Sequence, residues 1–143
     1  MKQKSHTTSR FGLILLVLGA AATASAGTDD PLYVLKPSLA VDEHGNGHAT
    51  LDIKAKQGYK WNKEFPSKLV IDSQKGAALT KQKFVKSDVR TADKGKNATF
   101  DLGPAGKVGP NAVIHGKVSF SLCTKKMCKV FMNREVTFKV SDQ

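Results

Sequence analysis

The chain has 143 residues, of which 23 are Lys or Arg and 12 are Asp or Glu, so its formal net charge is +11. Residues 27–143, which remain after an expected export signal, have the size of one small domain, which excludes a core plus a second catalytic domain. Because the basic residues are scattered and export is expected, we favour a solvated basic surface over nucleic-acid binding, with docking to an acidic partner or an anionic envelope surface as the alternative.

Residues 1–26 are typical of a cleaved signal peptide. A basic start is followed by twelve apolar residues at positions 11–22 and by the small residues Ala24, Ser25 and Ala26. An N-terminal membrane anchor is the alternative, but the apolar run is too short to span a bilayer. We therefore expect a mature chain without stable membrane insertion, located in the periplasm or secreted.

The mature chain shows short strand-like segments separated by turn residues. Residues 32–41 predict a strand that Pro37 places at a sheet edge or breaks in two, and residues 48–55 alternate after the turn-rich residues 42–47. A loop at 57–66 carries three aromatic residues, Tyr59, Trp61 and Phe65. Further strands are predicted at 68–72, 79–89, 98–102 and 111–122, with turns at 73–77, 91–97 and 103–110.

This pattern predicts an all-β fold with about seven or eight strands and no sustained amphipathic helix. An immunoglobulin-like β-sandwich is favoured over a barrel by the length of the chain and by the resemblance given below.

The two cysteines, Cys123 and Cys128, have four residues between them and strand-like alternation on both sides. If residues 124–127 form a hairpin loop, the cysteines face each other across the first rung of an antiparallel ladder. Opposed Cβ atoms there lie about 4.5–5.5 Å apart, close to what a disulfide requires. The two cysteines of an exported domain are expected to be in an oxidising compartment, with no further cysteine to compete for pairing.

Three features together resemble a known family: the segment GYKWNKEFP at 58–66 before a strand that begins at Lys68, the segment CTKKMC at 123–128, and the export signal. The chain is similar to the N-terminal periplasmic domain of the thiol–disulfide interchange reductase DsbD, also described as a disulfide-bond-corrector domain. The sequence departs from the family after the second cysteine, where Lys129, Val130 and Phe131 replace a proline-containing stretch.

The resemblance implies an immunoglobulin-like sandwich that relays electrons through a catalytic pair, Cys123 and Cys128. It also implies that Tyr59, Trp61 and Phe65 belong to a cap or partner-contact loop near the pair. The implied partners are thiol-redox proteins of the envelope, including a separate membrane electron donor, and no cofactor or metal is implied.

The residue types leave three functions open. In a thiol–disulfide relay, Lys125, Lys126 and Lys129 would favour the thiolate, and either cysteine could be the attacker. In a non-enzymatic binding module the same disulfide would staple two strands, although so small a closed loop gains little chain entropy.

The third function is copper binding, with Cys128, Met127, Met132 and His115 as soft ligands. Met127 and Cys128, however, are expected to point to opposite faces of a strand, and Met132 is expected to fill the core. His44 and His48 are expected to be solvated, and the three loop aromatics could be core residues or a carbohydrate- or peptide-binding patch.

Overall fold

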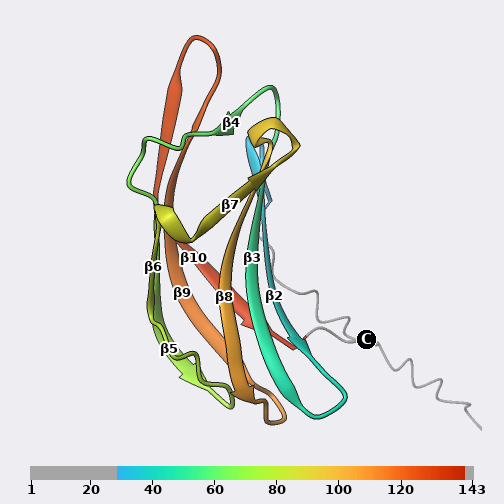
Figure 1. The fold of residues 1–143 in the computed structure, drawn as a ribbon. Coiled ribbons are helices and arrows are strands. Elements are labelled where there is room, and N and C mark those ends of the chain that lie inside the picture. The colour runs from blue at the N-terminus through green and yellow to red at the C-terminus, as the bar shows by residue number, and fades with distance from the viewer. Residues whose placement is uncertain (1–28, 141–143) are drawn as a thin grey trace, which may run out of the picture.

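The computed structural model describes residues 29–140, which form two antiparallel sheets packed face to face (Figure 1). The first sheet has the order β1-β2-β3-β8-β7 and consists of β1 (Asp29–Asp30), β2 (Tyr33–Val41), β3 (Asn46–Ala55), β8 (Asn97–Lys107) and β7 (Val89–Ala92). The second has the order β10-β9-β5-β6 and consists of β10 (Cys128–Lys139), β9 (Val113–Cys123), β5 (Lys68–Lys75) and β6 (Lys83–Val85), while β4 (Lys60–Trp61) pairs with the end of β9. The predicted all-β, immunoglobulin-like sandwich is confirmed, whereas the expected signal at 1–26 lies outside the described residues.

The predicted first hairpin is also confirmed. β2 and β3 pair from Tyr33 opposite Ala55 to Val41 opposite Gly47, and the turn between them is closed by the Asp42 carboxylate, which accepts hydrogen bonds from the backbone N–H groups of His44 and Asn46. These bonds, the one from Asn46 above all, hold the pKa of Asp42 below its ordinary value.

The core lies between the sheets and is built by the alternation along each strand. Every second residue of β3, such as Leu51 and Ile53, points inward and is buried, and the residues between them are exposed or partly exposed. Five aromatic rings form a cluster between the two sheets. Trp61 stacks on Phe120 with 5.7 Å between ring centroids and contacts Phe100 of the first sheet edge to face. Tyr33 and Phe131 complete this cluster. Their ring centroids are 4.8 Å apart, and each lies 5.1 Å from the ring centroid of Phe120.

Three predicted segments differ from the structure. The predicted turn at 73–77 begins within β5, which continues to Lys75. The predicted turn at 103–110 begins within β8, which continues beyond Gly103 to Lys107 because register shifts opposite β3 accommodate the left-handed backbone of Gly103. The predicted strand at 79–89 is reduced to β6 and the start of β7, separated by the 3-10 turn η1 (Lys86–Asp88). Asp88 interrupts the strand because its carboxylate accepts hydrogen bonds from the Val85 N–H and the Lys81 ammonium.

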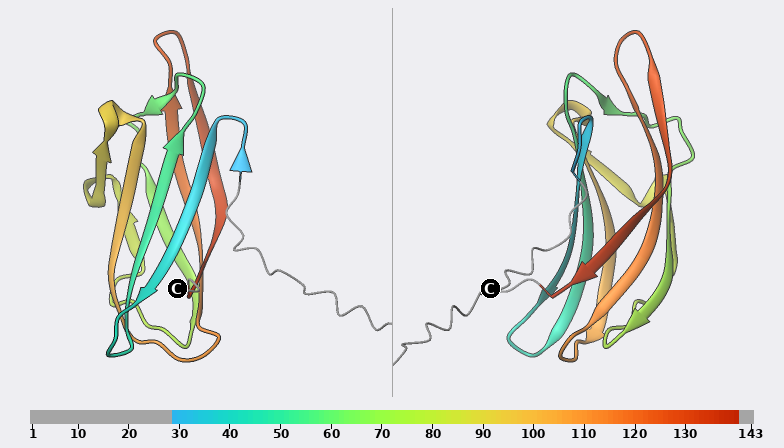
Figure 2. Two further views of the ribbon diagram at one scale, coloured as in Figure 1. Left: turned by 90° about the vertical axis from the view of Figure 1, so that its right-hand side faces the viewer. Right: turned by 180° about the vertical axis from the view of Figure 1, so that it is seen from behind.

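The ribbon of β9 and β10 is the longest hairpin and carries both cysteines. Its ladder runs from Cys128 opposite Cys123 to Lys139 opposite Val113 and is interrupted by a bulge between Phe131 and Arg134. Its loop extends beyond the other connections at the same end of the sandwich (Figure 2). Within residues 29–140, no helix is long and apolar enough to cross a membrane.

Candidate functional site: the disulfide hairpin

Cys123 and Cys128 form a disulfide at the last rung before the β9–β10 loop. Their Cα atoms are 4.0 Å apart, as the predicted opposition across the hairpin requires. Beyond them the Thr124 N–H donates to the Met127 carbonyl at 2.8 Å, and the Thr124 hydroxyl accepts from the N–H groups of Lys126 and Met127 at 3.2 Å. The loop is therefore closed by its own hydrogen bonds as well as by the disulfide.

The cysteines point away from the core. Phe120, Leu122 and Phe131 alternate with them along the two strands and are buried between the sheets, so Cys123 and Cys128 lie on the outer face of the ribbon. Cys128 is exposed, and Cys123 is partly buried. Cys128 is therefore the more accessible residue of the pair.

Cys123 is partly buried because β9 has neighbours on both sides at this point. β10 lies on one side, and on the other β4 pairs Lys60 with Cys123 and Trp61 with Leu122. The Asn62 N–H then donates to the Ser121 carbonyl at 3.0 Å. The loop that contains Tyr59, Trp61 and Phe65 is thus brought beside the cysteine ribbon.

The three aromatic residues of this loop have different surroundings. Tyr59 and Trp61 are each only 8% exposed and belong to the core, whereas Phe65 is partly exposed. Trp61 supports the ribbon from inside, because its ring stacks on Phe120, which lies three residues before Cys123. Their role as a cap or partner contact stays a prediction.

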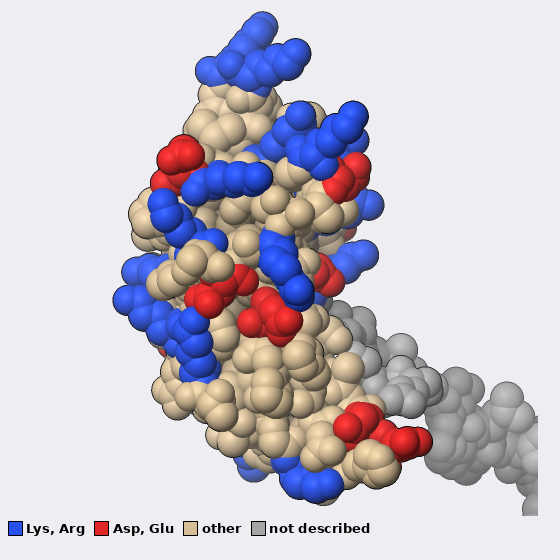
Figure 3. Space-filling model, viewed as in Figure 1, with Lys and Arg blue, Asp and Glu red and all other residues tan. Residues whose placement is uncertain are grey.

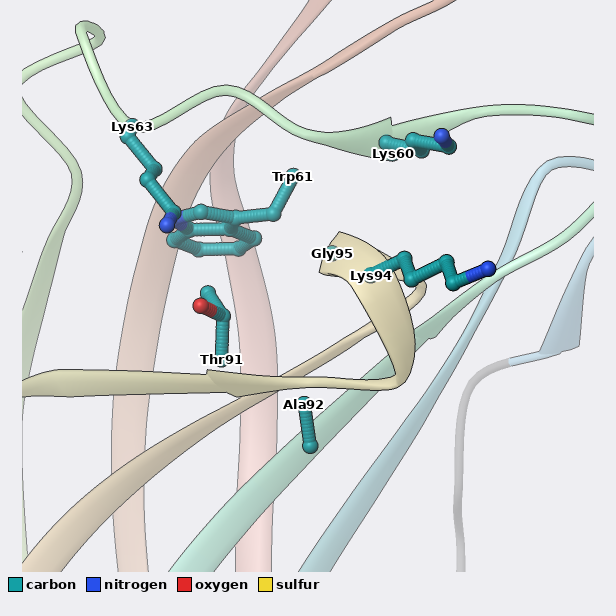
Figure 4. A pocket seen from close by; sticks show the side chains of 7 residues that line it. All are labelled: Lys60, Trp61, Lys63, Thr91, Ala92, Lys94 and Gly95. Carbon is teal, nitrogen blue, oxygen red and sulfur yellow. The ribbon is translucent and has the colours of Figure 1, made fainter.

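A hollow of about 250 Å³ lies below β4, where the loop meets η2 (Asp93–Gly95) and β7. Figure 4 shows the Trp61 ring between the side chains of Lys63 and Thr91, while Lys60 and Lys94 extend away from the ring. The hollow therefore exposes the edge of the core to solvent next to the cysteine ribbon.

The disulfide end of the sandwich is basic. Lys125 and Lys126 form the exposed tip of the loop, Lys129 follows Cys128, and Lys63 and Lys94 lie on the neighbouring loops. In Figure 3, which has the same view as Figure 1, Lys or Arg side chains form the tip of this end and recur on the loops below it, with a few Asp or Glu side chains beside them. Positive charge near a cysteine favours its thiolate, and over this whole end it favours an acidic partner.

The side chains proposed for copper are not brought together. His115 is hydrogen-bonded to Thr137 at 3.1 Å and lies eight residues before Cys123 on β9, or about 26 Å along an extended strand. Met132 is 53% exposed, so the expectation that it fills the core is wrong. Among residues 29–140 no group of three or more His, Cys, Asp or Glu residues is placed to hold a metal ion.

Histidines 44 and 48 are exposed, as expected. His44 lies beside Glu43, and His48 is hydrogen-bonded to Asp101 at 2.8 Å. Burial alone would raise the pKa of Asp101, but hydrogen bonds from the Gly103 N–H and from His48 hold it below its ordinary value.

Sequence reasoning missed the polar residues that pack behind the cysteines. Ser119 and Ser121 alternate with the core residues of β9 and therefore lie on its outer face, yet both are fully buried. Ser119 accepts a hydrogen bond from the Asn133 N–H at 2.9 Å, and the Ser121 hydroxyl lies 3.4 Å from the Asn62 amide nitrogen. The only signal for this cover was Asn62 itself, within the loop predicted at 57–66.

Comparison with protein-family models and with curated proteins found no match for this chain.

Proposed function

We propose that this protein is an envelope thiol–disulfide exchange domain that relays electrons through Cys123 and Cys128. The observation that carries the proposal is the position of the disulfide, on the outer face of a projecting ribbon with Cys128 exposed. Exposed disulfides have higher reduction potentials than structural ones and are the labile or catalytic ones, because exchange requires access for a foreign thiolate. The family resemblance and the expected export signal support the same function.

The structure supports Cys128 as the sulfur that an incoming thiolate attacks. A bond forms between the donor sulfur and Cys128 Sγ, the Cys123–Cys128 bond breaks, and Cys123 leaves as a thiolate that the lysine-rich surroundings stabilise. A second donor thiolate then attacks the donor sulfur of the mixed disulfide and releases Cys128. Two electrons enter the domain, and the donor leaves as a disulfide.

The second half-reaction runs in the opposite sense toward an acceptor. The Cys128 thiolate attacks the acceptor disulfide and displaces one acceptor thiolate, and Cys123 then attacks Cys128 Sγ to restore the original bond. The acceptor is left with two thiols. The proposed partners are thiol-redox proteins of the envelope, with a separate membrane protein as donor.

The test combines a reduction potential with single-cysteine variants. Equilibration with glutathione buffers is expected to give a potential above roughly −300 mV, the level below which structural disulfides usually lie. Cys123→Ser, which keeps Cys128, is expected to accumulate a mixed disulfide with a thioredoxin that lacks its resolving cysteine and whose remaining cysteine carries thionitrobenzoate in disulfide linkage; Cys128 attacks the thioredoxin sulfur and thionitrobenzoate leaves as the thiolate. Cys128→Ser is expected to accumulate far less, and the double serine variant none.

A different result would assign the protein to the alternative function, a binding module with a structural disulfide. That result is a potential far below this level together with no mixed disulfide from either single variant.

A further inference from the structure

The edge of β10 beside Cys128 has hydrogen-bonding groups that point away from the sheet. Antiparallel ladders alternate between hydrogen-bonded and non-hydrogen-bonded pairs. Thr124 and Met127 form a hydrogen-bonded pair, so Cys123 and Cys128 are a non-hydrogen-bonded pair, as their Cα separation of 4.0 Å also indicates. By the same alternation Ser121 and Val130 do not bond to each other, and the Ser121 carbonyl indeed accepts from Asn62 on the opposite side.

It follows that the N–H and C=O groups of Cys128 and Val130 face outward from β10. β10 is the terminal strand of its sheet, and in the described part of the chain no strand pairs with this segment from the outer side. An edge with outward N–H and C=O groups is the surface to which an extended peptide adds as a further strand.

The side chains at this edge are suited to a partner. The described residues include five large exposed apolar side chains, and Met127, Val130 and Met132 are three of them, each just over half exposed. Val130 and Met132 share the outer face with Cys128, because Phe131 between them points into the core. Lysines 125, 126 and 129 surround this apolar stripe with positive charge.

We propose that the redox partner docks by adding a strand antiparallel to β10, with its reactive cysteine directly opposite Cys128. This inference rests on the proposed function. The partner segment is extended and carries apolar residues near its cysteine and acidic residues beyond them. These match the apolar stripe formed by Cys128, Val130 and Met132 and the lysines around it.

The geometry of such a pair suits the exchange reaction. On the outer edge Cys128 would form a hydrogen-bonded pair, in which Cα atoms lie about 5.5 Å apart, within the range of disulfides. The partner cysteine and Cys123 would then lie on opposite sides of Cys128. A thiolate attacks a disulfide from the side opposite the leaving sulfur, so the partner sulfur would bond to Cys128 Sγ as Cys123 departs with the electron pair.

The test uses a reduced synthetic peptide with a central cysteine, a valine on each side of it and glutamates at both ends. One version is N-methylated at the cysteine amide, which the proposed pairing points at the Cys128 carbonyl. The matched control is N-methylated at the following valine, whose amide points away from β10 because amides alternate along a strand. Each rate of mixed-disulfide formation with the full chain is divided by the rate of the same peptide with glutathione disulfide.

We expect methylation at the cysteine to lower the normalised rate about fivefold, the equivalent of one hydrogen bond, and methylation at the valine to leave it unchanged. On the protein, Val130→Ser is expected to slow the glutamate-flanked peptide, whereas Val85→Ser, at the exposed apolar residue on the opposite edge of the same sheet, is not. Reduction of both variants by dithiothreitol should match that of the parent chain.

Equal rates for the two methylated peptides would overturn strand addition. If the disulfide still equilibrates with glutathione, the relay function stands without it. A disulfide that opens with neither peptide nor glutathione would overturn both proposals.

Discussion

We expect the disulfide to contribute only part of the stability of the fold, so the reduced protein should remain folded. The two cysteines are five residues apart in sequence, and loop-closure entropy for so small a ring amounts to about 2 kcal/mol. Folded domains of this size are typically stable by about 5–15 kcal/mol. The ribbon has a second anchor, because Phe131 is buried against Phe120 and Tyr33 in the aromatic cluster.

The perturbation is reduction with dithiothreitol, compared with the double variant Cys123→Ser, Cys128→Ser. Both forms are expected to unfold cooperatively with a Tm about 8 °C below that of the oxidised protein. Thermal melts followed by circular dichroism measure this shift. Fluorescence of Trp61, the single tryptophan, reports on packing against Phe120, three residues from Cys123.

Loss of cooperative unfolding on reduction, or a Tm lower by more than about 20 °C, would refute the reasoning. Either result would mean that the disulfide holds the ribbon in place and that the aromatic cluster does not suffice. A protein that unfolds when reduced could not serve as a relay.

Three further perturbations test the fold around the site. Phe131→Ala removes an anchor of the aromatic cluster and should lower the free energy of unfolding by about 3–5 kcal/mol in urea titrations, against no more than about 0.5 for the exposed Lys129→Ala. Gly116→Ala should destabilise by about 1–3 kcal/mol in the same assay, because the added Cβ would lie 2.8 Å from the Val70 carbonyl oxygen and push β5 from β9. The hydrogen bonds from Lys81 and the Val85 N–H hold the pKa of Asp88 below 3.8, so its ionised form stabilises the fold above that pH, and the stabilisation is lost as the pH falls through the folded pKa. The Tm difference between the parent chain and Asp88→Asn should therefore be present at pH 7 and shrink as the pH falls below 3.8, and a difference that does not change with pH would contradict this origin.

The alternation of apolar and polar residues predicted most strands of the sandwich, because most strands bury one face against the core. β2, β3, β5 and β9 follow from the sequence to within a few residues, apart from the last three residues of β5, since one face of each strand meets the core. β4 is only two residues long and is held by pairing with the distant residues Leu122 and Cys123, a contact that no local pattern contains. The Asp88 hydrogen bonds that shorten β6 depend likewise on a side chain outside the strand.

The candidate site was predictable as a pair of opposed sulfurs but not in its surroundings. Residues 130–132 are all apolar, so alternation alone does not say which of them points inward. The pairing of Cys123 with Cys128 decides it, because the outward cysteine places Val130 and Met132 outside and Phe131 inside. The burial of Ser121 behind Asn62 depends on a contact over 59 residues and could not be read from either segment alone.

The bulge between Phe131 and Arg134 limits how strongly an added strand can pair with β10. It twists β10 and ends its regular edge after a few residues, so an added chain can align with only a short stretch. The same bulge disfavours edge-to-edge pairing of β10 between two copies of the protein. For the proposed relay, so short a pairing segment would favour release of each partner after exchange.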